Sequence, residues 1–198
     1  MTHAVGPGEL EPAHGRQDDH DATIALDLPA VLVSTRQAVA AAGRADRYTV
    51  VGADIFDEPG DGGAYDRAIA RNRYHLFDEA ANRRLLARLH DALRPYRRVD
   101  IVDILLRGLM ARAAVLYALG LLLRTTTERI YPFTPYVGWL RATGFEAVER
   151  HDVGGAPPLS LIVAPQLYAL RGPSPRSRRL GRAMASVAPS RTVSARAA

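Results

Sequence analysis

Short apolar runs alternate with stretches of helical period, and this alternation restricts the fold more than any other feature of the sequence. Thr23–Leu28 and Tyr48–Ile55 are apolar runs of strand length, each with an acidic residue close to its end. A helical stretch that opens at Pro29 separates them. Strands alternating with helices are typical of a parallel sheet covered on both faces. The sequence therefore predicts an α/β fold.

The clearest helical period lies in Phe77–Leu93, where leucines recur at i, i+3 and i+4 spacings and Pro95 comes soon after. A helix at Pro135–Thr143 is expected to end at Gly144. The last two strands are separated by a turn rich in Gly and Pro, which predicts an antiparallel hairpin at the end of the sheet. The other expected elements are strands at Tyr65–Arg71, Val99–Leu105, Phe145–Val153 and Leu159–Ala164, and a helix at residues 109–124.

The 198 residues, 47% of them hydrophobic, suffice for one domain with a buried core. Residues 1–21 are rich in Gly, Pro, His and Asp without a sustained period, which predicts a degenerate or disordered segment. Residues 22–168 form the predicted domain. Residues 169–198 consist mostly of Arg, Ser, Pro and Ala, which predicts a disordered tail.

Composition excludes several kinds of chemistry. The chain has no cysteine and no lysine, which rules out thiolate catalysis, cysteine-ligated zinc, disulfides and Schiff bases on lysine. Much of the net charge of +5 comes from the arginine-rich tail, for which we expect solvation rather than specific nucleic-acid binding. The most apolar run, Ala113–Leu123, is too short to cross a bilayer, and no signal-peptide pattern is present. We expect a cytoplasmic protein without a membrane contact.

The residues that carry chemistry lie at the ends of the predicted strands. Asp27 and Asp54 lie at the ends of the first two apolar runs, and the segment Arg71–His75 lies at the end of the third. In a parallel sheet these ends share one edge, where ligands of open α/β sheets bind. A ligand site is therefore expected at this edge.

Six stretches in order resemble the S-adenosylmethionine-dependent O-methyltransferases, in particular bacterial relatives of the caffeic acid and acetylserotonin enzymes. The resemblance runs from Ala22 to Ala164 and implies a Rossmann-like methyltransferase sheet. Each stretch alone is a weak signal, but their order and spacing are specific. They read ALDLPAV, VVGADIF, RNRYHLFDEAANRRLLARLHDALRP, VDIVDIL, TERIYPFTPYVGWLRATGF and PLSLIVA.

The resemblance implies S-adenosyl-L-methionine as the cofactor. Asp27, in the D-L-P stretch, would accept hydrogen bonds from the ribose hydroxyls, as a carboxylate at a strand end can. Asp54 would accept from the adenine amino group, with Phe56 beside it, and Arg71 would lie near the cofactor. The plainer alternatives are a helix N-terminal acid for Asp27, a turn residue for Asp54 and an exposed arginine for Arg71.

The resemblance also implies that His75, at the start of an H-x-[WF]-D segment, is the general base for the acceptor hydroxyl. Imidazole suits this role because it exchanges protons near neutral pH. Asp103, twenty-eight residues later at a strand end, would orient the ring, and Glu128 resembles a second acid near the base. A structural histidine and surface acids are the alternatives. Four aromatic residues would either line the acceptor pocket or belong to the core: Tyr131, Phe133, Tyr136 and Trp139.

The match fails at the beginning of the domain. The family has a central strand there and then a glycine-rich loop that closely approaches the cofactor. This sequence retains two of those glycines, Gly6 and Gly8, and the residues after them lack an apolar face. The family's N-terminal dimerisation domain has no counterpart, so we do not expect the family homodimer. His14, His20 and the nearby aspartates fit no metal template, and no metal site is predicted.

These observations leave three possible functions. The first is methyl transfer from S-adenosylmethionine to a hydroxyl of an aromatic or polyketide-like small molecule. The second is a truncated, inactive homologue that acts through a partner or not at all. The third is a basic interaction module that uses the arginine-rich tail.

Overall fold

The computed structural model describes residues 22–57, 63, 65–106, 119–120, 129–154, 158–166 and 191–196, the last segment by its main chain alone. Some expectations from the sequence lie outside these residues and stay predictions. They concern Gly6, Gly8, Glu128, the helix at 109–124 apart from residues 119–120, and the N-terminal segment 1–21.

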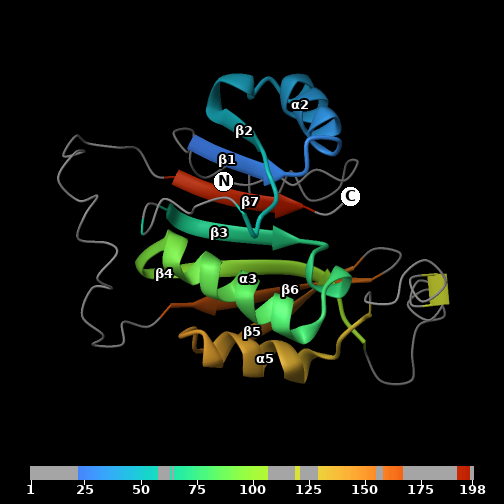
Figure 1. The fold of residues 1–198 in the computed structure, drawn as a ribbon, viewed down its shortest axis with the longest axis vertical. Coiled ribbons are helices and arrows are strands. Elements are labelled where there is room, and N and C mark those ends of the chain that lie inside the picture. Colours follow the sequence, from blue (N-terminus) through green and yellow to red (C-terminus); the bar gives the residue numbers. More distant parts are fainter. Residues whose placement is uncertain are drawn as a thin grey trace.

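In the described part of the chain, seven strands form one sheet in the order β2-β1-β7-β3-β4-β6-β5 (Figure 1). The strands from β2 to β4 in this order run parallel, whereas β6 is antiparallel to both β4 and β5. The predicted α/β sheet with an antiparallel hairpin is therefore confirmed. The strands are β1 Ala22–Asp27, β2 Tyr48–Gly52, β3 Tyr65–Arg71, β4 Leu93–Ile104, β5 Glu149–Gly154, β6 Leu159–Pro165 and β7 Arg191–Arg196.

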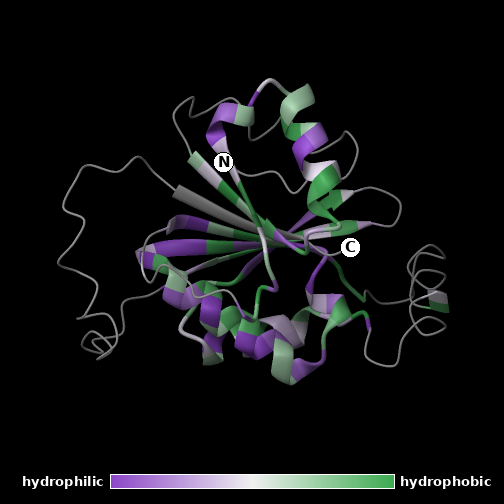
Figure 2. Cartoon of the chain, turned by 45° about the horizontal axis from the view of Figure 1, so that its top comes forward, coloured by the Kyte–Doolittle hydropathy of each residue, from purple (hydrophilic) through white to green (hydrophobic). Residues whose placement is uncertain are grey.

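Helices cover both faces of the sheet (Figure 2). Helix α2 (Leu32–Ala41) packs on one face, and α3 (Glu79–Ala92) and α5 (Phe133–Ala142) pack on the other. The predicted leucine stripe of α3 is buried against the sheet, because its spacing places these side chains on one side of the helix. Of the two 3₁₀ turns within the described ranges, η1 (Ala45–Arg47) leads into β2, and η2 (Tyr74–Leu76) lies between β3 and α3. Among the described helices, none combines the length and the apolarity needed to cross a bilayer.

Several element ends differ from the predicted ones for local reasons. Strand β2 stops at Gly52 because Asp54 turns the chain, accepting from the Phe56 amide at 2.8 Å. Strand β5 begins at Glu149, after Ala147 adopts a left-handed φ of 45°. Helix α5 ends before Gly144 as predicted. This glycine has φ 94°, and a Cβ on it would lie 2.9 Å from Nε2 of His90.

Strand β7 is the main departure from the prediction, because residues 191–196 belong to the tail expected to be disordered. It lies between β1 and β3 and pairs with Ala22–Leu26 on one side and Arg67–Arg71 on the other. For these six residues the prediction of disorder is corrected. A composition averaged over the tail does not reveal that a short segment can form main-chain hydrogen bonds with two neighbouring strands at once. The resemblance placed a missing strand at the centre of the sheet, and β7 is central here.

The central place of β7 leads to the first prediction. Proline at position 193 removes one main-chain donor from a strand that is paired on both sides. We expect Val193→Pro to lower the free energy of unfolding by about 1–3 kcal/mol, as for a buried group left unsatisfied. Urea unfolding monitored by circular dichroism measures this, with Ala198→Pro, beyond the strand, as the control. Equal stability of the two variants would contradict the pairing.

Candidate functional site

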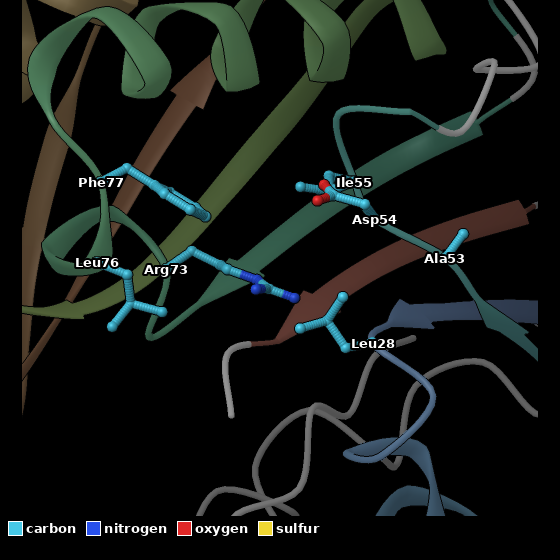
Figure 3. Close-up of a pocket in the computed structure, with 7 residues that line it drawn as sticks. All are labelled: Leu28, Ala53, Asp54, Ile55, Arg73, Leu76 and Phe77. Carbon is cyan, nitrogen blue, oxygen red and sulfur yellow. The ribbon is translucent and has the colours of Figure 1, made fainter.

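A pocket of about 280 Å³ opens at the carboxyl ends of the parallel strands (Figure 3). Its wall comes from the residues after β1, β2 and β3, because those three strands end at the same edge of the sheet. The main-chain amide of Ala53 donates to the Asp27 carbonyl at 3.0 Å and ties the first two strand ends together. The lining residues are Leu28, Ala53, Asp54, Ile55, Arg73, Leu76 and Phe77.

The wall offers apolar contact together with one exposed carboxylate. Asp54 stands on the turn after β2, and its Oδ1 accepts from the Phe56 amide, which fixes the direction of the side chain. Phe77 faces the pocket and meets Phe56 edge-to-face, with ring centroids 5.2 Å apart. The guanidinium of Arg84 covers the Phe56 ring at 4.6 Å. Phe56 thus supports the wall from behind and does not line it.

Asp27 forms a buried ion pair with Arg73. The guanidinium of Arg73 lies 2.6 Å from Oδ1 of Asp27, which also accepts from the Leu28 amide at 2.7 Å. The side chains of Arg73 and Asp27 are 7% and 2% exposed. Burial lowers the pKa of Arg73, and the charges of Asp27 and then Asp54 act against this shift. Asp27 itself is not among the residues that line this pocket, whereas Arg73 is.

A turn at Asn72 explains how Arg73 reaches the pocket. Asn72 adopts a left-handed φ of 51°, a conformation that asparagine tolerates better than most residues. Its amide donates to the Val102 carbonyl at 2.8 Å, which holds the turn against β4. Figure 3 shows the Arg73 side chain extending across the pocket toward Leu28. Arg71, the predicted neighbour of the cofactor, ends β3 and is not among the lining residues.

His75 and Asp103 form a second buried pair, two residues beyond Arg73 along the chain. Nδ1 of His75 lies 2.7 Å from Oδ1 of Asp103, and the two side chains are 3% and 0% exposed. Asp103 lies at the end of the apolar part of β4, and His75 lies in η2 directly after β3. The register of β3 and β4 sets the two ends side by side, with Arg71 opposite Val102. The carboxylate of Asp103 also accepts from two amides, Tyr74 at 2.9 Å and Ile104 at 2.8 Å.

This arrangement fixes the orientation of the imidazole. A carboxylate that already accepts two amide hydrogens has only acceptor capacity for His75, so Nδ1 of His75 carries the hydrogen of this bond. The Tyr136 hydroxyl approaches the same carboxylate at 3.4 Å. Burial, reinforced by the charge of Asp103, raises the pKa of Tyr136 well above its usual value, and that of Tyr74 likewise. Both phenols therefore stay neutral around the pair.

The aromatic residues that the sequence suggested either as lining of the acceptor pocket or as core belong largely to the core. Tyr136 and Trp139 are almost wholly buried on α5, and their rings pack at 5.2 Å. Tyr131 packs on Trp139 and donates its hydroxyl to the Phe77 carbonyl at 2.9 Å. Phe133 is partly buried against the same cluster. These rings position the segment that carries His75 and Phe77.

The structure thus brings together only part of the predicted site. Asp54 lines the pocket, whereas Asp27 is paired behind Arg73. His75 and Asp103 are in contact with each other. The sequence did not point to the pocket roles of Arg73 and Phe77. The signal for Arg73 was the asparagine before it, since a left-handed turn at a strand end redirects the next side chain.

Comparisons with known proteins concern the sequence and the fold. No family model matches the chain. A 3-hydroxy-5-methyl-1-naphthoate 3-O-methyltransferase from Streptomyces sahachiroi is 32% identical over 135 residues, which cover 67% of this chain and 39% of that protein. The chain therefore spans less than half the length of this relative.

Solved structures of O-methyltransferases share the fold. Human N-acetylserotonin methyltransferase, in complex with S-adenosylmethionine, has a TM-score of 0.62 at 19% identity, over 74% of this chain and 41% of that one. An O-methyltransferase family 2 protein from Planctomyces limnophilus, in complex with apigenin, has a TM-score of 0.63 at 20% identity, over 82% and 54%. At such identities these two structures establish the fold alone.

The hydrogen bonds of Asp103 lead to the second prediction. Asparagine at this position turns an amide donor toward groups that themselves donate, so at least one buried group loses its partner. We expect Asp103→Asn to lower the free energy of unfolding by about 2–3 kcal/mol. The control is Glu79→Gln, which breaks an exposed ion pair with Arg83 and costs about 0.5 kcal/mol or less. Urea unfolding of both variants decides, and equal losses would refute the structural role of Asp103.

Proposed function

We propose that this chain binds S-adenosylmethionine and transfers its methyl group to a hydroxyl of an aromatic small molecule. By sequence and fold the chain belongs to the S-adenosylmethionine-dependent O-methyltransferases, and it spans about half or less of the length of the relatives named above. The observation that carries the proposal is the joint placement of two features. A nucleoside-sized pocket and an oriented histidine share the short segment directly after β3.

The residues of the pocket fit the nucleoside of this cofactor. A volume of about 280 Å³ is close to the lower end of small-molecule sites, about 300 Å³. Phe77 and Ile55 supply apolar surface for a flat base, and the Asp54 carboxylate can accept from an amino group on that base. Asp27 would accept from the ribose hydroxyls once its carboxylate is reached.

The pair of His75 and Asp103, beside the pocket, supplies the proton transfer. S-adenosylmethionine, when bound, offers an electrophilic methyl group on a sulfonium. His75 would accept the proton of the acceptor hydroxyl at Nε2, because its Nδ1 already donates to Asp103. Asp103 holds the ring in this tautomer, and its negative charge stabilises the imidazolium. Loss of this proton would leave the acceptor oxygen as an oxyanion, which is a better nucleophile than the hydroxyl.

An aromatic acceptor is the substrate class that the comparisons support. The naphthoate methyltransferase acts on a hydroxyl of a fused aromatic acid, and the Planctomyces protein was solved with apigenin. Cofactor and acceptor would then be the small molecules that this chain binds.

The third prediction concerns cofactor binding. Asp54→Asn keeps the shape of the residue but replaces half of an acceptor-only group by a donor. In isothermal titration calorimetry with S-adenosylmethionine, we expect the unaltered chain to bind and this variant to bind at least about tenfold more weakly, the equivalent of about 1.4 kcal/mol. Asp57→Asn, on the same turn outside the pocket, is the control. Failure of the unaltered chain to bind the cofactor would end the proposal.

The fourth prediction separates binding from chemistry. With 3-hydroxy-5-methyl-1-naphthoate and methyl-labelled cofactor, His75→Ala is expected to slow label transfer by about 10²–10⁴-fold. Its affinity for S-adenosylmethionine should stay unchanged, since His75 is not among the lining residues. His151→Ala, on the exposed face of β5, is the matched control. Transfer at the original rate by the His75 variant would exclude this histidine as the base.

A further inference from the structure

The ion pair between Arg73 and Asp27 occupies Oδ1 of the carboxylate that a ribose would need. Arg73 approaches Oδ1 of Asp27 at 2.6 Å, a short distance for a charge-assisted hydrogen bond. The same oxygen accepts from the Leu28 amide at 2.7 Å. A ribose hydroxyl that donates to this oxygen must share it with two donors already in place.

Arg73 also separates Asp27 from the pocket. Leu28 and Arg73 line the pocket, whereas Asp27 does not and is 2% exposed. Figure 3 shows the guanidinium at the pocket edge beside Leu28, on the side of the β1 end. A ligand in the pocket therefore meets the guanidinium before it meets the carboxylate.

Separating Arg73 from Asp27 costs free energy, and this cost lowers the affinity for a ligand that needs Asp27. Both partners are nearly buried, and a buried charge that loses its counter-charge is strongly destabilised. Burial already lowers the pKa of Arg73, and Asp27 is the main group that acts against this shift. A ligand that takes over Asp27 must supply the free energy that separates the two charges, and its measured affinity falls accordingly.

From this geometry we infer that Arg73 competes with the ribose of the cofactor for the carboxylate of Asp27. Arg73 must leave this carboxylate before the cofactor binds fully. The inference rests on the proposed function, since it assumes a nucleoside ligand with ribose hydroxyls. It assigns Arg73 a negative effect on affinity, opposite to that of a residue that binds the ligand directly.

Arg73→Met tests this, because methionine keeps much of the side-chain length but neither the charge nor the donors. We measure the affinity for S-adenosylhomocysteine and for its 2′,3′-dideoxy analogue by isothermal titration calorimetry. The variant should bind S-adenosylhomocysteine at least about tenfold more tightly than the unaltered chain. The gain should be absent for the analogue, which has no ribose hydroxyls. Arg94→Met, which breaks an ion pair with Asp66 at the opposite end of β3, should change neither affinity.

A second readout needs no ligand. Arg73→Met should lower the thermal midpoint of the free protein, because Asp27 loses its counter-charge. The double variant Arg73→Met/Asp27→Asn should recover stability but show no gain in affinity, since no carboxylate is left to release. A double variant that keeps the full gain would show that Arg73 does not act through Asp27.

The outcomes separate this inference from the proposed function. If the unaltered chain binds and Arg73→Met binds equally or more weakly, the inference is overturned while the proposed function stands. Binding by the variant alone would support both. If neither protein binds S-adenosylhomocysteine, both are overturned.

Discussion

The pairing of β7 with β1 on one side and β3 on the other holds together the two halves of the sheet. Without a strand between them, the inner edges of β1 and β3 would carry unpaired amides and carbonyls in the middle of the molecule. The strand also sets the spacing of the site, because Asp27 ends β1 and Arg73 comes just after β3. Two strand spacings, roughly 10 Å, separate these ends, a gap that the side chains of Arg73 and Asp27 bridge together.

One short segment after β3 serves both parts of the site. The left-handed turn at Asn72 sends Arg73 toward Asp27, and two residues later His75 turns to Asp103 near the end of β4. The residues proposed for binding and for proton transfer therefore share one backbone segment, tied to β4 by the Asn72 amide and by the Tyr74 amide. If the proposed function holds, a shift of this segment would change the cofactor affinity and the orientation of His75 together.

The sequence predicted the features that depend on local pattern. The leucine period predicted helix α3. The acids at the ends of apolar runs predicted that Asp27, Asp54 and Asp103 lie at one edge of the sheet, and the imidazole of His75 does contact Asp103. Its role as a base stays a prediction. Strand β7 was not predictable, because RTVSAR has weak strand character by itself and gains its hydrogen bonds from strands more than a hundred residues away. For the position of Arg73, the local signal was the asparagine before it, because the left-handed φ at Asn72 redirects the next side chain.

The most direct measurement is a crystal structure of the full chain grown with S-adenosylhomocysteine. We expect residues 191–196 in the sheet between β1 and β3, the adenine between Asp54 and Phe77, and the ribose on Asp27 with Arg73 turned away. A ligand bound elsewhere on the molecule, or a ribose distant from a carboxylate that Arg73 still holds, would contradict this arrangement.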